Sequence, residues 1–127
     1  MKNFKNHYKI KKATVEEVYT ALTNPFTIEL WTGYPAQMDT TPGSEFSLWE
    51  GDIVGRNLDF VHNKKIVQEW YFGDQQEQSI VTIELFPDKK GVRVKLEHTN
   101  IPDEAYENMK EGWNNYYFEN LKRFFDF

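Results

Sequence analysis

The sequence has no cysteine among its 127 residues. This absence excludes disulfides, thiolate nucleophiles and cysteine-ligated zinc sites, and it favours a reducing compartment. Long apolar runs are also missing, because none approaches the roughly 20 residues that span a bilayer. The segment Met1–His7 lacks the apolar stretch of a secretory signal. We therefore expect a cytoplasmic protein that does not associate with membranes and whose interior is held by packing alone.

Positive charge is scarce as well. Fifteen Lys and Arg against twenty Asp and Glu give a net charge of −5, which argues against nucleic acids and anionic membranes as partners. Aromatic residues are abundant, with 10 Phe, 7 Tyr and 4 Trp making up 17% of the chain, and this content is typical of a folded chain. We expect residues 1–127 to form a single domain with a sizeable core.

The first part of the chain predicts a strand followed by two short helices. Apolar and polar residues alternate over residues 4–11, as in a half-buried strand. Thr14 and Glu17 have the spacing of a capping box, so a helix begins after Thr14. It ends before Pro25, because the proline ring disfavours helical geometry in the preceding residue. Residues 26–31 are expected to form a second short helix that folds back on the first.

The middle of the chain predicts an antiparallel meander. Alternating segments are separated by short turns rich in Gly, Asn, Asp and Lys, and they comprise residues 45–49, 53–60, 66–72, 80–86 and 92–99. The alternation places one apolar set on the inner face: Phe46, Leu48, Leu58, Phe60, Ile66, Trp70, Phe72, Val81, Ile83, Val94 and Leu96. Trp49 and Tyr71 are expected on the outer face, near Val67, where a cluster of rings would suit a partner protein or a second copy.

The last part of the chain predicts one long helix from Asp103 to about Phe125. Its apolar residues recur at helical spacing and comprise Tyr106, Met109, Trp113, Tyr116, Tyr117, Leu121 and Phe124. Such a helix is about 34 Å long, which is enough to cross a small domain. Gly112 in its interior costs about 1 kcal/mol relative to alanine. We therefore expect the backbone there to approach a neighbouring element or a bound ligand.

This order of elements predicts an α+β fold. A curved antiparallel sheet of six or seven strands must bury one face, and the long helix has only that face on which to lay its apolar stripe. A bent sheet does not contact a straight helix evenly along its length. Space therefore opens between the helix and the concave face, where apolar ligands bind.

Three segments carry a family resemblance. They read FSLWEGDIVG at residues 46–55, KIVQEW at 65–70 and EGWNNYYFENLK at 111–122. The chain resembles, over nearly its whole length, the C-terminal domain of the activator of the heat-shock-protein-90 ATPase and its stand-alone bacterial relatives. The resemblance implies the START-like helix-grip fold, whose wider superfamily holds lipids and other apolar molecules between sheet and helix. It also implies a link to the chaperone, although we expect none of the N-terminal chaperone-binding domain of the eukaryotic members here.

The inward aromatic pattern is the main candidate site. We expect ligand-binding residues at Phe46, Leu48, Leu58, Phe60, Trp70, Phe72, Met109, Trp113 and Tyr116, with Gln68, His98, Tyr106 and Tyr116 as polar groups that either orient a ligand or satisfy backbone groups. The alternative is that the rings fill the interior themselves. We favour a partly filled core with a small cavity at one end. A void of about 300 Å³ or more would suit a drug-sized guest.

Catalytic and metal sites find no support in the sequence. His7, His62 and His98 do not share the close spacing of metal ligands. There is no Gly-x-Ser-x-Gly elbow, and Ser44, Ser47 and Ser79 have no histidine in a recognisable arrangement. No phosphate-binding glycine loop precedes a helix. We therefore expect no enzyme activity, no cofactor and no metal.

Two functions from different classes are favoured, and a third, enzymatic one is kept only because related folds sometimes act on what they hold. The first is non-enzymatic binding of a small hydrophobic or lipid-like ligand between the C-terminal helix and the sheet. The second is a co-chaperone module that contacts a heat-shock-protein-90-type chaperone through the outer surface of the sheet. In either case we expect a monomer or a weak homodimer.

Overall fold

A computed structural model describes residues 1–75 and 77–126. Its strands are β1 (Lys2–Lys11), β2 (Glu45–Leu48), β3 (Ile53–Val61), β4 (Lys65–Trp70), β5 (Ser79–Asp88) and β6 (Gly91–Ile101). Its α-helices are α1 (Val15–Thr23), α2 (Pro25–Thr32), α3 (Tyr106–Gly112) and α4 (Phe118–Phe125). The strands form one antiparallel sheet in the order β1-β6-β5-β4-β3-β2. The predicted α+β class and the antiparallel meander are confirmed.

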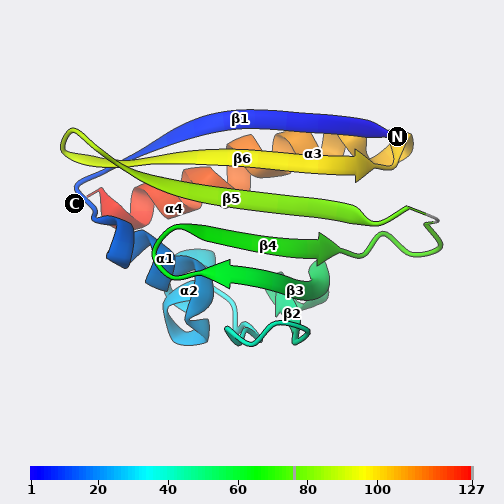
Figure 1. Cartoon of the computed structure of the whole chain (residues 1–127), viewed down its shortest axis with the longest axis horizontal. Helices are drawn as coiled ribbons and strands as arrows, with labels where there is room; N and C mark the ends of the chain where they lie inside the picture. Colours follow the sequence, from blue (N-terminus) through cyan, green and yellow to red (C-terminus); the bar gives the residue numbers. More distant parts are fainter. Residues whose placement is uncertain (76, 127) are drawn as a thin grey trace.

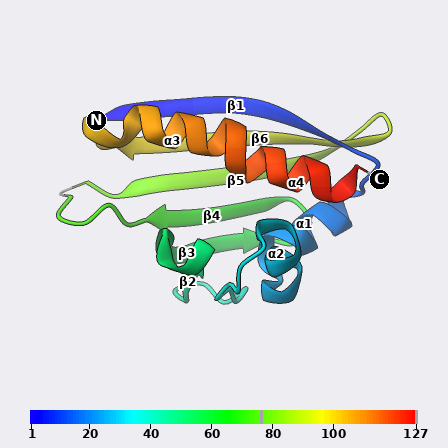
Figure 2. The same cartoon turned by 180° about the vertical axis from the view of Figure 1, so that it is seen from behind.

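The helices cover one face of the curved sheet and leave the other face open (Figure 1). Helices α3 and α4 run across the sheet as one rod, which Figure 2 shows in front of the strands. Helices α1 and α2 lie at the end of the sheet near α4, where α2 packs against α4 and α1 against β5 and β6. This arrangement is the predicted helix-grip fold.

Local capping explains the two short helices. The Thr14 hydroxyl accepts from the Glu17 amide at 3.2 Å, and the Glu17 carboxylate accepts from the Thr14 amide at 3.0 Å, which completes the predicted capping box. Asn24 ends α1 and also caps α2, because its side-chain oxygen accepts from the amides of Phe26 and Thr27 at 3.0 Å each. One residue therefore closes one helix and opens the next, and the chain folds back.

The core follows most of the predicted inner face. Its buried members from that set are Phe46, Leu48, Ile66, Trp70, Val81, Ile83, Val94 and Leu96. Phe72, predicted at the end of a strand, lies two residues beyond the end of β4 and packs against the core from there. Phe46 lies over Gly55 on β3, where an alanine Cβ would come within 2.8 Å of its ring and would collide with the Glu69 carbonyl oxygen.

Strand β3 departs from the predicted alternation at one residue. Its pairing with β4 shifts between Asn57 and Asp59, which makes Leu58 the extra residue of a β-bulge. Asn57 and Phe60, on either side of the bulge, both pair with buried residues of β4. The prediction that Leu58 lines the interior is wrong, because an unpaired residue resets the two-residue period of the strand.

The long helix contains a turn that its sequence period did not predict. A π-helical segment, Trp113–Tyr117, joins α3 to α4, and the Phe118 amide donates to the Trp113 carbonyl five residues back. A π turn holds one residue more than the regular helical repeat, so the faces on its two sides are offset. Tyr116, predicted to face the sheet, is 58% exposed, whereas Phe118, absent from the predicted stripe, is fully buried.

Candidate functional site

A cavity of about 200 Å³ lies between the middle of the long helix and the turn that joins β2 to β3. It is partly open to solvent, and it is lined by Trp49, Asp52, Ile53, Trp70, Met109, Gly112, Trp113, Tyr116 and Tyr117. The volume is below the size that we set for a drug-sized guest. It is nevertheless well above that of a single water molecule, so a small molecule fits. Buried aromatic and aliphatic side chains pack together in the core behind it.

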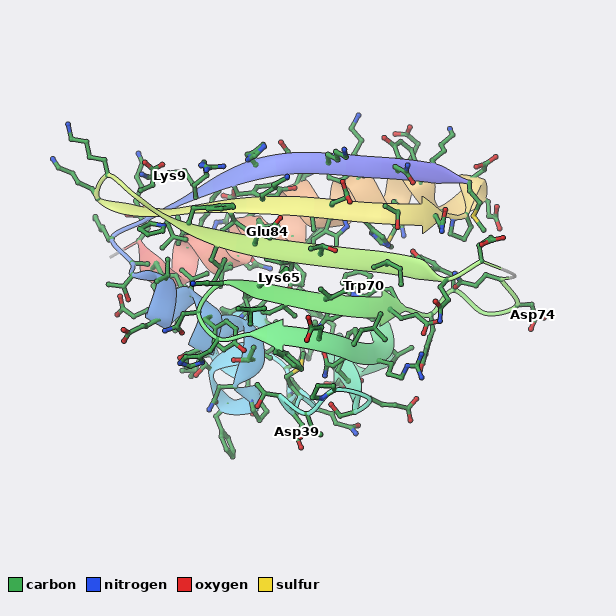
Figure 3. The ribbon with its side chains drawn as sticks, in the orientation of Figure 1. Lys9, Asp39, Lys65, Trp70, Asp74 and Glu84 are labelled. Carbon is green, nitrogen blue, oxygen red and sulfur yellow. The ribbon has the colours of Figure 1, made fainter. Side chains whose placement is uncertain are left out.

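Two stacked indoles form the rigid inner wall of this cavity. The rings of Trp70, at the end of β4 (Figure 3), and Trp113 lie 4.6 Å apart with an interplanar angle of 28°. Trp70 Nε1 donates to Gln68 Oε1, and Trp113 Nε1 donates to His98 Nδ1, both at 3.0 Å. Each ring is therefore fixed in orientation by a buried hydrogen bond, so the wall is pre-formed.

The hydrogen bond from Trp70 continues into a buried polar chain. Gln68 Nε2 donates to Asn57 Oδ1 at 3.0 Å. Asn57 Nδ2 in turn donates to the Asp39 carbonyl at 3.1 Å and lies 3.2 Å from the Ser44 hydroxyl, which ties down the segment before β2. Gln68 was a candidate for orienting a ligand. Its amide is used to hold Trp70 and Asn57 instead.

His98 lies behind Trp113 in a second buried network. Because Nδ1 accepts from Trp113, the ring hydrogen is on Nε2, which lies 2.8 Å from Ser79 Oγ. The Ser79 hydroxyl donates onward to the Thr99 carbonyl at 3.0 Å. Burial lowers the pKa of His98 to about 3, so the ring is neutral near pH 7.

His98 lies beside Ser79, although no recognisable arrangement in the sequence joins the two residues. Strand pairing places Val81 opposite His98, and Ser79 lies on the same face two residues away, a relation across strands that spacing along the chain does not reveal. The pair is not a nucleophile with its base. His98 donates to Ser79 and has no free lone pair with which to take its proton, and both side chains are completely buried.

The β2–β3 turn supplies the wall opposite the helix. Trp49, Glu50 and Gly51 are consecutive left-handed residues with φ of 50°, 53° and 94°. This geometry directs the Trp49 ring inward, where it lies 5.9 Å from Tyr117 and 5.7 Å from Trp31 between ring centroids. The prediction that Trp49 faces outward is wrong, because β2 ends at Leu48 and strand alternation no longer applies. Left-handed backbone is unfavourable for a bulky residue and is concentrated at functional sites.

Tyr117 is one of the residues that line the cavity, and it carries a phenol hydroxyl. Its side chain is only 5% exposed, and burial raises the pKa of its phenol above the usual value, so the group is neutral. The hydroxyl forms no hydrogen bond with any residue that the structure describes. The Tyr117 hydroxyl is not among the fully buried polar atoms that lack a partner, whereas the Nε of Arg56 is. The hydroxyl oxygen therefore keeps some solvent-accessible surface. A buried phenol with an unused donor and acceptor is suited to orienting a ligand.

Gly112 borders the cavity from the helix. An alanine Cβ at this position would meet no other atom within 4 Å. The prediction of a close approach to a neighbouring element is therefore wrong, and the space beside Gly112 is available to the cavity that it lines.

The nine predicted ligand-binding residues separate into two groups. Trp70, Met109, Trp113 and Tyr116 line the cavity. The others lie elsewhere, with Phe46 and Leu48 buried in the core, Phe60 and Phe72 packed against it, and Leu58 at the bulge. The cavity is also lined by Trp49, Asp52, Ile53 and Tyr117, which no sequence pattern placed there. The turn signal Glu50-Gly51 was the available hint, because a glycine there permits the left-handed turn that brings the first three residues of this set together.

The outer face of the sheet is polar. Lys5 and Glu97 form an ion pair at 3.1 Å, and Lys65 and Glu84 are cross-strand partners on β4 and β5 (Figure 3). Tyr71 is exposed, whereas Trp49 is turned inward, so the predicted pair of outward rings does not form. The most exposed apolar side chains lie elsewhere. They are Phe26 and Leu30 on α2, with 78% and 70% of their surfaces exposed, and Tyr34 just after this helix is 46% exposed.

Searches for metal ligands and membrane spans give no candidates in residues 1–75 and 77–126. No three His, Asp or Glu side chains come together there in a metal-binding arrangement. No helix in these ranges is both long enough and apolar enough to cross a bilayer.

Residues 12–126 match the family described as Activator of Hsp90 ATPase homolog 1-like protein. The Activator of 90 kDa heat shock protein ATPase homolog 1 of Homo sapiens is 33% identical over 114 residues, which are 88% of this chain and 34% of the human protein. The chain thus spans about a third of the length of the curated relatives that match most of it.

Solved structures share the fold. The crystal structure of PFC0360w, described as an HSP90 activator from Plasmodium falciparum, has a TM-score of 0.85 and 26% identity, covering 95% of this chain and 94% of that one. Protein MLL2253 from Mesorhizobium loti has a TM-score of 0.82 and 24% identity, covering 98% and 97% of the two chains. The second likeness concerns the fold alone.

Proposed function

The chain belongs to the family of Activator of Hsp90 ATPase homolog 1-like proteins, and we propose that it is a non-enzymatic binding domain that holds a small, mainly apolar ligand in the aromatic cavity. The observation that carries this proposal is the cavity itself. A pre-formed hollow of about 200 Å³, walled by rings from the helix, β4 and the β2–β3 turn, lies beside the buried core. A ligand there would remove apolar surface from water without reorganising the core.

The lack of enzyme activity is part of the same proposal. The buried Ser79–His98 pair lies behind Trp113 and has the wrong hydrogen-bond direction for nucleophilic attack. Asp52 is the one carboxylate among the described residues that line the cavity. General acid and base catalysis needs a proton donor and an acceptor of matched pKa at the reacting group. The cavity offers groups for binding and orientation instead.

A titration tests the proposal. We expect at least one member of a panel of small ligands, comprising indole, phenol, cyclohexanol and hexanol, to change the intrinsic tryptophan fluorescence of the wild type in a saturable way. Gly112→Leu should weaken that binding at least about tenfold, because its side chain enters the cavity. Asn115→Leu is the matched control, since it adds the same side chain to an exposed position of the same helix. Failure of the whole panel, or equal binding by Gly112→Leu, would contradict the proposal.

A second candidate function is that of a co-chaperone module for an Hsp90-type chaperone. For this function, too, we propose the cytoplasmic location that the sequence predicts. It is favoured by the human and Plasmodium relatives, whose names refer to that activity. The polar outer face of the sheet is a poor apolar docking surface. The exposed apolar side chains of α2, above all Phe26 and Leu30, are the better candidate contact.

The chaperone function has its own test. We expect the purified chain to raise the ATPase rate of the Hsp90-type chaperone of its host, and the Phe26→Ser/Leu30→Ser variant to lose this effect. Lys95→Ser on the outer face of β6 serves as the control and should retain it. An unchanged ATPase rate together with a lack of co-purification would contradict this function. Gly112→Leu separates the two functions, because it should weaken ligand binding and still raise the ATPase rate.

A further inference from the structure

We propose that the ligand of the aromatic cavity carries a small alkylated ammonium group, such as the trimethylammonium of choline. This inference rests on the ligand-binding function proposed above and names the chemical class that the cavity selects. It is drawn from three features of the cavity: its rings, its charge and its size.

The rings surround the space from several elements. Five aromatic side chains line the cavity, and they are Trp49, Trp70, Trp113, Tyr116 and Tyr117. The face of an aromatic ring carries partial negative charge and attracts a cation within about 6 Å, with indole the strongest of the natural rings. These rings come from the β2–β3 turn, β4 and the π-helical turn, and among them Trp113 is itself stacked on Trp70 and on Phe118. Proteins bind quaternary ammonium groups among several such rings, so we refer to the five together as the aromatic cage.

The charges around the cage have one sign. Asp52 lines the cavity and its carboxylate forms no ion pair or hydrogen bond with any described residue. No Lys, Arg or His is among the described residues that line the cavity, and the whole chain carries a net charge of −5. An anionic ligand would meet repulsion here, whereas a cation gains both from the unpaired carboxylate and from the ring faces.

The polar groups and the volume fit the same class of ligand. The unpartnered hydroxyl of Tyr117 is neutral and can bond a hydroxyl carried by the ligand, such as that of choline. The volume of about 200 Å³ is only a little larger than an apolar cavity of about 150 Å³ that holds benzene. A trimethylammonium group is of this size, whereas an acyl chain would have to remain outside.

Calorimetric titration with choline and with dimethylbutanol, its uncharged isostere in which carbon replaces nitrogen, tests the inference on the wild-type chain. We expect choline to bind at least about tenfold more tightly, since the two ligands differ only in charge. Asp52→Asn should weaken choline binding about fivefold and leave dimethylbutanol unchanged. Asp59→Asn is the matched control, because it removes the same charge from the outer face of β3, and it should change neither affinity.

The outcomes separate this inference from the function on which it rests. Equal binding of choline and dimethylbutanol, or binding of panel ligands without choline, overturns the ammonium class and leaves the binding function standing. Failure of every ligand overturns both. A parallel titration with dihexanoylphosphatidylcholine, kept below its micelle concentration, assigns the source. If the lipid binds as tightly as choline, the natural ligand is a lipid headgroup. If the lipid binds much more weakly than choline, the natural ligand is a free small cation. Both results support the ammonium chemistry.

Discussion

Two glycines show how the consequence of one substitution depends on its neighbours. Gly112 has ordinary helical angles and open space beside its Cα, so nothing in the packing requires a glycine there. Gly55 has no unusual φ, yet the Phe46 ring and the Glu69 carbonyl occupy the place of a Cβ. The first glycine keeps the cavity wide, and the second lets β2, β3 and β4 pair closely.

The same change to alanine should therefore have opposite effects at these two positions. Gly112→Ala should raise the free energy of unfolding by about 1 kcal/mol through helix propensity, and it should weaken ligand binding by narrowing the cavity. Gly55→Ala should lower the free energy of unfolding by about 3 kcal/mol through overpacking. Urea denaturation of both variants measures the difference. A Gly112→Ala variant that is destabilised as strongly as Gly55→Ala would contradict the open space beside the helix.

His98 makes stability depend on pH. Its pKa is about 3 in the folded chain, against about 6.5 in an unfolded chain, so the unfolded state binds the proton first as pH falls. The stabilisation by neutral His98 is complete above the unfolded value and decreases as pH falls from about 6.5 towards 3. We expect His98 alone to remove about 2 kcal/mol of unfolding free energy between about pH 7 and pH 5.

The variant His98→Gln isolates this effect. Glutamine keeps a polar side chain between Ser79 and Trp113 but has no proton to gain, so the variant should be less stable at neutral pH and less sensitive to acid. Chemical denaturation at pH 7, 6 and 5 gives the slope of unfolding free energy against pH for the wild type and for the variant. Equal slopes for the wild type and His98→Gln would mean that His98 is not the group that titrates on unfolding.

At the scale of elements, the π-helical turn decides which rings meet the sheet. It places Trp113, Tyr117 and Phe118 together on the inner side, and it turns Tyr116 towards the mouth of the cavity. Phe118 stacks on Tyr8 of β1 at 4.0 Å between ring centroids, which joins the helix to the edge of the sheet. The turn is thus where one helix serves both the core and the candidate site.

A π turn is equivalent to one residue inserted into a regular helix. Deleting Asn115, which is exposed within the turn, should therefore restore a regular helix and keep the faces of α3 and α4. Deleting Asn120 from α4 should rotate Leu121 and Phe125 by about 100° away from the core. Thermal unfolding followed by circular dichroism should show a cooperative transition for the first variant and none for the second. The opposite order would contradict the one-residue origin of the turn.

The elements and the site differ in how far the sequence predicts them. The capping box at Thr14, the break at Asn24 and the long helix depend on neighbours in the chain, so local patterns are sufficient to predict them. The bulge at Leu58 and the π turn after Gly112 each add a residue whose cost is offset by distant partners. The local periodicity of the sequence does not indicate such partners, so it predicts neither feature.

The candidate site shows the same limit. Helical and strand spacing brought Trp70, Met109 and Trp113 into the predicted lining. The left-handed turn that directs Trp49 inward is fixed by packing against Trp31 and Tyr117, residues far away in the sequence. The Ser79–His98 contact likewise depends on the register between β5 and β6. Site geometry depends on such long-range contacts more than the fold class does.

At the scale of the whole molecule, the position of the cavity follows from the arrangement of helix and sheet. The helix packs against β1, at one edge of the sheet, through α4. The β2–β3 turn lies at the opposite edge (Figure 2). Buried side chains fill much of the space between these edges, and Gly112 borders the hollow without a side chain of its own. The molecule therefore combines a packed core with a small hollow beneath the helix, and the walls of this hollow come from distant parts of the chain.

Ligand binding beneath the helix is the central claim, and the indole N–H signals of the four tryptophans test it most directly. Trp49, Trp70 and Trp113 line the cavity, whereas the Trp31 indole donates to the Ala21 carbonyl at 2.6 Å and does not line it. In a ¹H–¹⁵N titration with choline, or with the best ligand of the panel, we predict saturable shifts at the three lining indoles, largest at Trp49, and the smallest shift at Trp31. Unchanged spectra, or a largest shift at Trp31, would contradict the claim.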